Sequence, residues 1–255
     1  MFNSDNLRLD GKCAIITGAG AGIGKEIAIT FATAGASVVV SDINADAANH
    51  VVDEIQQLGG QAFACRCDIT SEQELSALAD FAVSKLGKVD ILVNNAGGGG
   101  PKPFDMPMAD FRRAYELNVF SFFHLSQLVV PEMEKNGGGV ILTITSMAAE
   151  NKNINMTSYA SSKAAASHLV RNMAFDLGEK NIRVNGIAPG AILTDALKSV
   201  ITPEIEQKML QHTPIRRLGQ PQDIANAALF LCSPAASWVS GQILTVSGGG
   251  VQELN

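Results

Sequence analysis

The chain has 255 residues, of which 46% are hydrophobic and 17% are charged, and its formal net charge is −6 at pH 7. An acidic chain without a basic run is a poor partner for nucleic acid or for an anionic membrane surface, and no stretch of 18 apolar residues could cross a bilayer. Soluble domains usually contain about 25% charged residues, so the low charge content suggests that part of the surface is buried between subunits.

Cysteines and histidines are few and scattered. Their spacing matches neither a zinc site nor a redox motif, so we expect no metal and free thiols in a reducing cytoplasm. Residues 1–10 lack a cationic stretch followed by an apolar core, so we also expect no signal peptide. The residues concerned are Cys13, Cys65, Cys67 and Cys232, and His50, His124, His168 and His212.

A glycine-rich loop stands between a predicted strand and a predicted helix near the amino terminus. Residues 13–17 form a short apolar run with β-branched side chains, and the helix over 23–34 ends at Gly35. Glycines let the backbone approach a pyrophosphate, and the helix start offers free N–H groups. The loop 18–24 therefore indicates a phosphate cradle, with an ordinary tight turn as the alternative.

The next predicted strand, 37–42, ends in an acidic residue that bears on cofactor choice. Asp42 lies 18 residues after Gly24, close to the spacing of about 20 expected of an acid that binds the adenosine ribose. A carboxylate there repels a 2′-phosphate, which favours NAD over NADP, and Ala21 adds no cation to the loop. A turn or helix-start role for Asp42, before the amphipathic helix 44–58, is the alternative.

Two more strands lead to polar loops. The strand 61–67 ends before Asp68, and Ser71 with Glu74 has the spacing of a capping box that opens a helix to residue 86. The strand 89–93 runs into two asparagines and then four consecutive glycines. Ligands of open α/β sheets bind at the carboxyl ends of strands, so both loops are candidate binding segments.

The stretch 108–135 is predicted to be mostly helical and apolar on nearly all sides, which indicates burial against the sheet and against a second subunit. Asn118 is a polar residue inside it, and a satisfied core amide is its simplest interpretation. The following strand, 139–145, has Ser146 at its end.

Strands and helices alternate to the end of the chain, without an internal repeat or a linker. This pattern predicts a single α/β domain over 1–255, a Rossmann-type doubly wound parallel sheet of about seven strands with helices on both faces. The remaining predicted elements are the strands 182–187 and 242–246 and the helix 222–231.

Tyr159 and Lys163 are four residues apart at the start of a predicted helix, so their side chains share one face. A free phenol titrates near ~10, and a nearby ammonium lowers that pKa. Such a pair can move a proton to or from a substrate oxygen. Taken alone, these residues are better explained as part of an ordinary amphipathic helix with one tyrosine and one lysine.

In this order and spacing, the motifs resemble those of the short-chain dehydrogenases/reductases along nearly the full chain. The resemblance implies an NAD-dependent oxidoreductase that interconverts a secondary alcohol and a ketone, and it implies a homotetramer. One departure is Ser247-Gly248-Gly249, where many members have Asp-Gly-Gly. The matching residues are Thr17, Gly18, Gly22, Ile23, Gly24, Asp68, Asn94, Asn95, Ala96, Gly97, Asn118, Ser146, Tyr159, Lys163, Pro189, Gly190 and Thr194.

The resemblance also implies a role for each site residue. Tyr159 exchanges the proton, Lys163 lowers its pKa and binds the nicotinamide ribose, Ser146 holds the substrate oxygen, and Asn118 anchors a water that links Lys163 to solvent. The cofactor contacts implied besides Tyr159 and Lys163 are Gly18, Gly22, Ile23, Gly24, Asp42, Asp68, Ile69, Asn95 and Thr194.

A closer likeness to bacterial family members that act on steroids implies a bile-acid 7α-hydroxyl as substrate. We expect residues 191–213 to form a lid over it, because Leu193, Leu197, Val200 and Ile201 have helical spacing. Packing of this face on its own domain or on another subunit is the alternative. A 3-oxoacyl thioester reductase, a sugar or polyol dehydrogenase, and a non-catalytic NAD-binding sensor also remain open.

Overall fold

The computed structural model describes residues 4–211 and 213–250, and in this part of the chain seven strands form one parallel sheet. The strand order is β3-β2-β1-β4-β5-β6-β7, which confirms the predicted doubly wound fold. His212, one of the scattered histidines and part of the predicted lid, lies outside the described residues. The strands are β1 (Cys13–Thr17), β2 (Ser37–Asp42), β3 (Gln61–Arg66), β4 (Ile91–Asn94), β5 (Gly139–Ile144), β6 (Ile182–Pro189) and β7 (Ile243–Val246).

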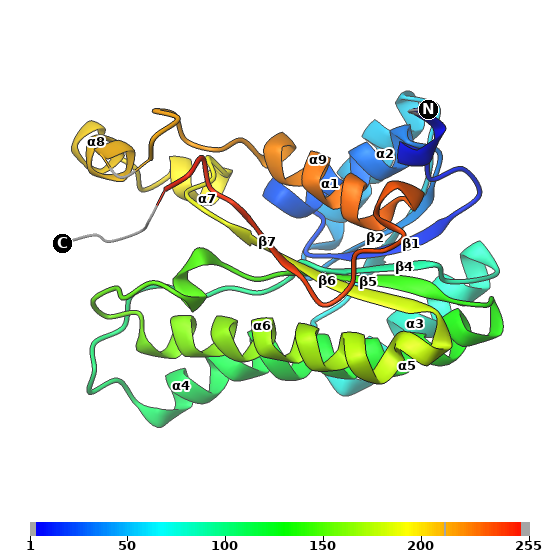
Figure 1. The fold of residues 1–255 in the computed structure, drawn as a ribbon, viewed down its shortest axis with the longest axis horizontal. Coiled ribbons are helices and arrows are strands. Elements are labelled where there is room, and N and C mark those ends of the chain that lie inside the picture. The colour runs from blue at the N-terminus through cyan, green and yellow to red at the C-terminus, as the bar shows by residue number, and fades with distance from the viewer. Residues whose placement is uncertain (1–3, 212, 251–255) are drawn as a thin grey trace.

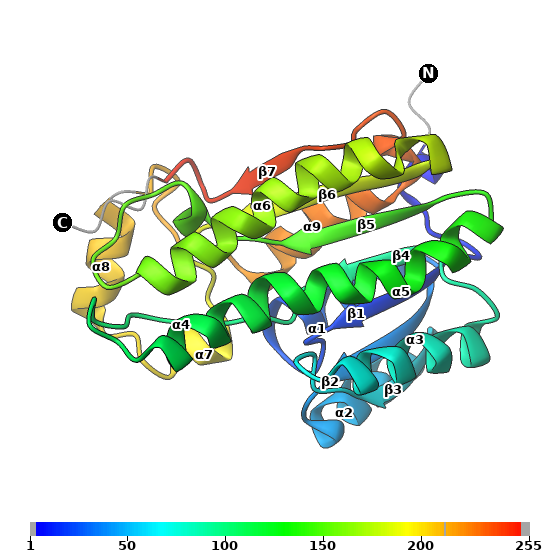
Figure 2. The ribbon, with the colours of Figure 1, turned by 90° about the horizontal axis from the view of Figure 1, so that it is seen from below.

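Helices cover both faces of the sheet, and two of them stand apart from it (Figures 1 and 2). One layer contains α1 (Gly22–Thr33), α2 (Ala45–Gln57) and α9 (Pro221–Cys232). The opposite layer contains α3 (Glu72–Leu86), α4 (Met108–Tyr115), α5 (Ser121–Lys135) and α6 (Thr157–Leu177). The short helices α7 (Asp195–Lys198) and α8 (Pro203–Gln211) lie beyond the carboxyl edge of the sheet.

The central strands read as continuous apolar runs because both of their faces are buried. Ile16 packs into the hydrophobic cluster under α1 and α9, whereas its neighbour Ile15 packs into the cluster under α3 and α5. Both isoleucines have no exposed surface. Burying one such side chain contributes roughly 1.5–3 kcal/mol, so these runs fix the strands between the two helical layers.

The predicted helix 108–135 is interrupted. A π-helical turn, Glu116–Phe120, separates α4 from α5 and contains Asn118. One side of the stretch is buried, with Phe122 and Leu125 at most 4% exposed, whereas Phe120 is 54% and Phe123 39% exposed, so the expected burial against a second subunit stays a prediction. No helix in the described part of the chain is sufficiently long and apolar to span a membrane.

Candidate active site

The loop between β1 and α1 has the shape of a phosphate cradle. Gly18 and Gly22 have φ values of 61° and 56°, and a Cβ atom on Gly24 would lie 2.2 Å from the Gly18 carbonyl oxygen. In the described structure no side chain caps the amino end of α1, unlike the ends of α2 and α3. The free N–H groups and the absence of Cβ atoms fit the pyrophosphate of a dinucleotide.

Asn95 braces this cradle from the end of β4. Its amide nitrogen donates hydrogen bonds to the carbonyl oxygens of Thr17 at 2.9 Å and Gly18 at 3.0 Å. The Thr17 hydroxyl in turn accepts the backbone N–H groups of Asn95 and Ala96. Sequence reasoning matched Thr17 to a motif but assigned it no role, and this cross-strand contact shows that it ties the two loops together.

Asp42 is held at the end of β2 by two backbone donors. Its Oδ2 accepts the N–H of Gly20 at 2.9 Å, and its Oδ1 accepts that of Asn44 at 2.9 Å. The carboxylate lines a hollow of about 250 Å³ together with Asp68 and Ile69. The predicted adenosine residues therefore surround one cavity.

Asp68 is fixed by the turn that follows β3. Its Oδ1 accepts the backbone N–H of Thr70 at 2.9 Å and the Thr70 hydroxyl at 2.7 Å. These hydrogen bonds hold the pKa of the Asp68 carboxyl below its usual value. Asp68 is therefore an anion beside the adenosine hollow at neutral pH.

A second cavity, of about 430 Å³, brings three of the four predicted catalytic residues together with the predicted nicotinamide residues at the carboxyl edge of the sheet. Its wall comes from the glycine loop, from the ends of β5 and β6, from α6 and from the start of the segment that carries α7. The predicted site residues that line it are Gly22, Ile23, Asn95, Ser146, Tyr159, Lys163 and Thr194.

The side chains of Tyr159 and Ser146 both line this cavity, close enough for the Ser146 hydroxyl to act on the phenol. Burial raises the pKa of Tyr159, and the Ser146 hydroxyl opposes the rise only in part. The expected lowering of this pKa by Lys163 is not seen in the chain alone, since the Lys163 Nζ atom lies 5.9 Å from the phenol ring centre and bonds elsewhere. Burial is the larger effect on the phenol.

Lys163 is a buried cation with a single described hydrogen-bond partner. Its side chain is 6% exposed, and Nζ donates to the carbonyl oxygen of Ile144 at the end of β5, at 2.8 Å. Burial lowers the pKa of Lys163 from 10.5 to about 8. The amine is thus still mostly charged at neutral pH, but at an energetic cost.

Asn118 links three elements behind the catalytic cavity. Its Oδ1 accepts the N–H of Gly98 at 3.0 Å, and its Nδ2 donates to the Gly98 carbonyl at 2.9 Å and to Ser162 Oγ at 3.1 Å. The fully buried Ser162 hydroxyl donates to the Tyr159 carbonyl at 2.8 Å. The sequence does not reveal Ser162 as a site residue, because its partner Asn118 is 44 residues away.

Thr194 completes the wall of the catalytic cavity. Its hydroxyl accepts the N–H of Leu197, and it lies against Gly22, where an added Cβ atom would be 3.3 Å from its methyl group. No cluster of described side chains has the composition of a metal site.

The segment of the predicted lid is joined to the fold at a stem, which we define as the two hydrogen-bonded stretches around Ala191–Leu193 and Gly219. Leu193 N–H donates to the Gly219 carbonyl at 2.7 Å, and Gly219 N–H donates to that of Ala191 at 2.9 Å. None of the described residues from 193 to 217 is buried, and Leu193, Leu197 and Ile201 are half-buried, so this face packs only in part on its own domain. The predicted single apolar helical face is wrong, because α7 ends at Lys198, before Val200.

Known proteins share this arrangement. Residues 18–250 match a family model described as enoyl-(acyl carrier protein) reductase. A 7α-hydroxysteroid dehydrogenase of Escherichia coli strain K12 is 99% identical over 255 residues, which cover 100% of each chain.

Solved structures agree with the sequence matches. A 7α-hydroxysteroid dehydrogenase complexed with NADH and 7-oxo glycochenodeoxycholic acid superposes with a TM-score of 0.98, at 99% identity and over 100% of each chain. A short-chain type dehydrogenase/reductase from Mycobacterium marinum has a TM-score of 0.92 at 36% identity, over 96% of this chain and 97% of its own. The chain therefore belongs to the short-chain dehydrogenase/reductase family.

Proposed function

We propose that this chain is an NAD-dependent oxidoreductase that interconverts the 7α-hydroxyl and the 7-ketone of bile acids. The observation that carries the proposal is 99% identity, over the whole length of both chains, to a 7α-hydroxysteroid dehydrogenase whose solved relative holds NADH and a 7-oxo bile acid. The cavity that contains Ser146, Tyr159 and Lys163 supports it, because it offers a proton carrier beside a dinucleotide cradle.

The cofactor supplies the hydride chemistry: NAD accepts a hydride from the alcohol carbon, and NADH returns it to the ketone carbon. The glycine loop would hold the pyrophosphate, with Gly18, Gly22, Ile23 and Gly24 closest to it. Asp42, Asp68, Ile69 and Asn95 would hold the adenosine half, and Thr194, Tyr159 and Lys163 the nicotinamide half. Asp42 would repel the 2′-phosphate of NADP.

Tyr159 would move the proton. In the oxidative direction its phenolate oxygen takes the proton of the substrate hydroxyl, and in reduction its phenol gives that proton to the ketone oxygen. The Ser146 hydroxyl, which lines the same cavity as Tyr159, would hold the substrate oxygen and stabilise its developing charge.

We infer that Lys163 and Asn118 act behind Tyr159. A Cβ atom on Gly97 would lie 2.6 Å from Asn118 Oδ1 and 3.4 Å from Lys163 Nζ, so the missing side chain leaves room between these two polar atoms. A water in that space would link Lys163 to Asn118 and carry protons toward solvent. Lys163 would also bind the nicotinamide ribose and favour the phenolate through its charge.

The substrate would enter beneath the lid, residues 191–213. Its exposed or half-exposed apolar residues include Leu197, Val200 and Ile205, beside the wall of the catalytic cavity formed by Asp195 and Ala196. Closure over a steroid skeleton would bury apolar area worth roughly 25 cal/mol per Å². A small sugar cannot supply that term.

A homotetramer is our proposal for the assembly. Two groups of elements expose large apolar side chains: α5, the turn before it and α6 expose Phe120, Phe123 and Phe175, and α9, β7 and the segment between them expose Phe230, Trp238 and Leu244. A tetramer with two-fold axes needs two self-complementary interfaces, which these two groups would supply. Light scattering at micromolar concentration should give four times the 26.8 kDa protomer mass, and a 26.8 kDa species would refute the proposal.

We propose a cytoplasmic location because the cysteines form no disulfide bonds. All four, Cys13, Cys65, Cys67 and Cys232, are free thiols, and burial raises the pKa of each. Unpaired, unreactive thiols are typical of proteins that work in a reducing compartment.

A panel of substrate classes tests the function. We expect a 7α-hydroxylated bile acid with NAD to give the highest kcat/KM, above a short 3-hydroxyacyl thioester and above a polyol, each measured with NAD and with NADP. Faster turnover of the thioester would favour the reductase class that the family model describes. NADH binding without turnover of any alcohol would favour a sensor.

A further inference from the structure

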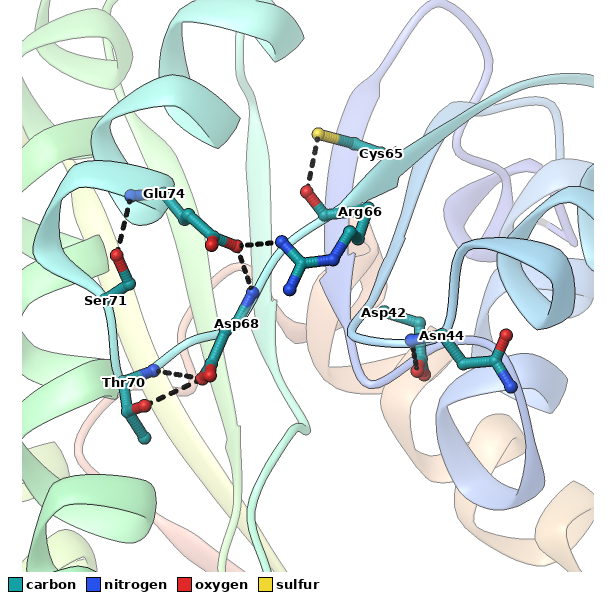
Figure 3. A network of polar contacts seen from close by, with 8 residues as sticks. All are labelled: Asp42, Asn44, Cys65, Arg66, Asp68, Thr70, Ser71 and Glu74. Atoms are coloured by element: carbon teal, nitrogen blue, oxygen red, sulfur yellow. Dashed lines mark hydrogen bonds and ion pairs between the residues drawn. The ribbon is translucent and has the colours of Figure 1, made fainter.

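A polar network connects the end of β3 to the start of α3 beside the adenosine hollow (Figure 3). Its centre is Glu74, whose Oε2 accepts the backbone N–H of Asp68 at 2.7 Å and the Arg66 guanidinium Nη1 at 2.7 Å. Because of these two donors, the pKa of Glu74 lies below its usual value, with the Asp68 N–H as the larger cause. The carboxylate is therefore charged at neutral pH.

This arrangement differs from the predicted capping box. Ser71 accepts the N–H of Glu74 at 3.3 Å, as expected of the first half of that motif. The Ser71 N–H, however, bonds to the Asp68 carbonyl, so it does not need the glutamate. Glu74 instead reaches past the helix start to Asp68 and Arg66, and its side chain serves the cofactor edge of the sheet.

Arg66 is a cation placed beside the residue that selects NAD. In the parallel pairing of β2 and β3, Arg66 is the register partner of Asp42. Neighbouring strands are about 4.8 Å apart, and paired residues direct their side chains to the same face. An arginine side chain is therefore long enough to reach a phosphate group bound next to Asp42, and its fork of donors suits phosphate oxygens.

In the structure that guanidinium is engaged elsewhere. Its Nη1 atom bonds to Glu74, and Figure 3 shows the side chain extended toward the start of α3. The two side chains are 52% and 34% exposed, so the pair lies at the surface, where a phosphate could compete for the arginine. To bind a phosphate, the Arg66 guanidinium would therefore have to break its ion pair with Glu74.

We propose that Glu74 is a specificity-determining residue for NAD over NADP, because its carboxylate holds the Arg66 guanidinium in an ion pair. The same carboxylate positions the adenine-binding turn by accepting the Asp68 N–H. This inference rests on the proposed NAD site. Asp42 repels a 2′-phosphate, and Glu74 holds in an ion pair the arginine that strand register places beside Asp42. Arg113, which also lines the adenosine hollow, is unchanged in every variant below. The two acids act on cofactor choice from neighbouring strands.

Glu74→Gln separates the two roles. The amide oxygen of glutamine can still accept the Asp68 N–H, but its neutral side chain no longer competes with a phosphate for Arg66. We expect the ratio of kcat/KM with NADP to kcat/KM with NAD to rise roughly fivefold or more, with the Kd for NADH within about twofold of wild type. Glu74→Ala, which also removes the acceptor for Asp68, should weaken NADH binding about fivefold.

A double variant distinguishes Arg66 from a general change in charge. Arg66→Gln combined with Glu74→Gln has the net charge of wild type and lacks the guanidinium, so the gain with NADP should disappear. Glu134→Gln, which breaks the exposed ion pair with Lys180 away from the cofactor edge, is the matched control and should leave the ratio unchanged.

An unchanged cofactor ratio in Glu74→Gln would overturn the inference, as would a gain with NADP that persists in the double variant. NADH binding by the wild-type chain, followed by fluorescence, is measured in the same series. If the wild type fails to bind NADH, the proposed function itself is wrong. If it binds and the ratio does not move, only the role of Glu74 is wrong.

Discussion

The catalytic centre and the lid sit on opposite sides of one cavity and are built in opposite ways. Asn118, Ser162 and Lys163 are each at most 6% exposed, and their polar atoms bond to three different elements. From 193 to 217 no described residue is buried, and the segment is tied down mainly at the stem between Ala191 and Gly219. The first region is fixed by its surroundings, and the second makes few contacts with the rest of the fold.

This difference divides the work of the enzyme. Proton transfer needs groups held in one geometry, which a buried and hydrogen-bonded network supplies. A bulky steroid needs a way in and an apolar cover, which a weakly packed segment supplies. Changes in the centre should therefore alter turnover, and changes in the lid should alter substrate affinity.

The largest effect should come from Tyr159→Phe. We expect turnover to fall about 1000-fold, since proton transfer by a positioned group contributes 10²–10⁴-fold, while the Kd for NADH stays within about twofold. Steady-state rates and NADH fluorescence titration measure the two quantities on one preparation. A variant that kept more than a few per cent of the wild-type rate would show that Tyr159 is not the proton carrier.

Lys163→Met should remove activity and stabilise the fold. The pKa of Lys163 is lowered from 10.5 to about 8, so keeping the buried amine charged at pH 7 opposes folding by roughly 3 kcal/mol. Wild-type stability should rise as the pH increases from 8 toward 10.5, because the unfolded chain then binds more protons. Denaturant unfolding at pH 7 and pH 10 checks both signs, and a less stable methionine variant at pH 7 would contradict this account.

The pH dependence should differ between the two directions of reaction. Reduction needs the Tyr159 phenol, whose raised pKa keeps it protonated, and the charged Lys163. Its kcat/KM should be flat below pH 7 and fall up to tenfold per unit above about 8, the pKa of Lys163. Oxidation needs the phenolate, so the ratio of oxidation to reduction should increase with pH. A reduction rate that is constant from pH 6 to 10 would show that neither group controls it.

Leu197→Ser in the lid should have the smallest effect of these variants, and it should change the KM for the substrate and not the turnover rate. Loss of one apolar contact of about 1–2 kcal/mol should raise the KM for a bile acid about tenfold, with NADH binding unchanged. Leu58→Ser is the matched control, because Leu58 is 64% exposed on the outer side of the fold. If Leu197→Ser lowered kcat and weakened NADH binding together, the division between centre and lid would be wrong.

The sequence predicts the features that depend on local patterns, and it does not predict those that depend on contacts between distant residues. Strands such as β1 and β2 were predictable because burial on both faces leaves an apolar run, and the helix starts at Asn44 and Ser71 were predictable because their caps are local. The Asn118–Ser162 contact and the π-helical turn depend on partners distant in sequence. The sign of the pKa shift of Tyr159 depends on burial, and spacing alone does not report it.

The rate of oxidation of cholic acid relative to its 7β epimer, at saturating NAD, tests the central claim most directly. A fixed Ser146–Tyr159 pair can receive the hydroxyl oxygen from one face of the steroid only, so we predict a kcat/KM for the 7α epimer at least about 100-fold higher. Comparable values for the two epimers would contradict the assignment of this site to the 7α-hydroxyl.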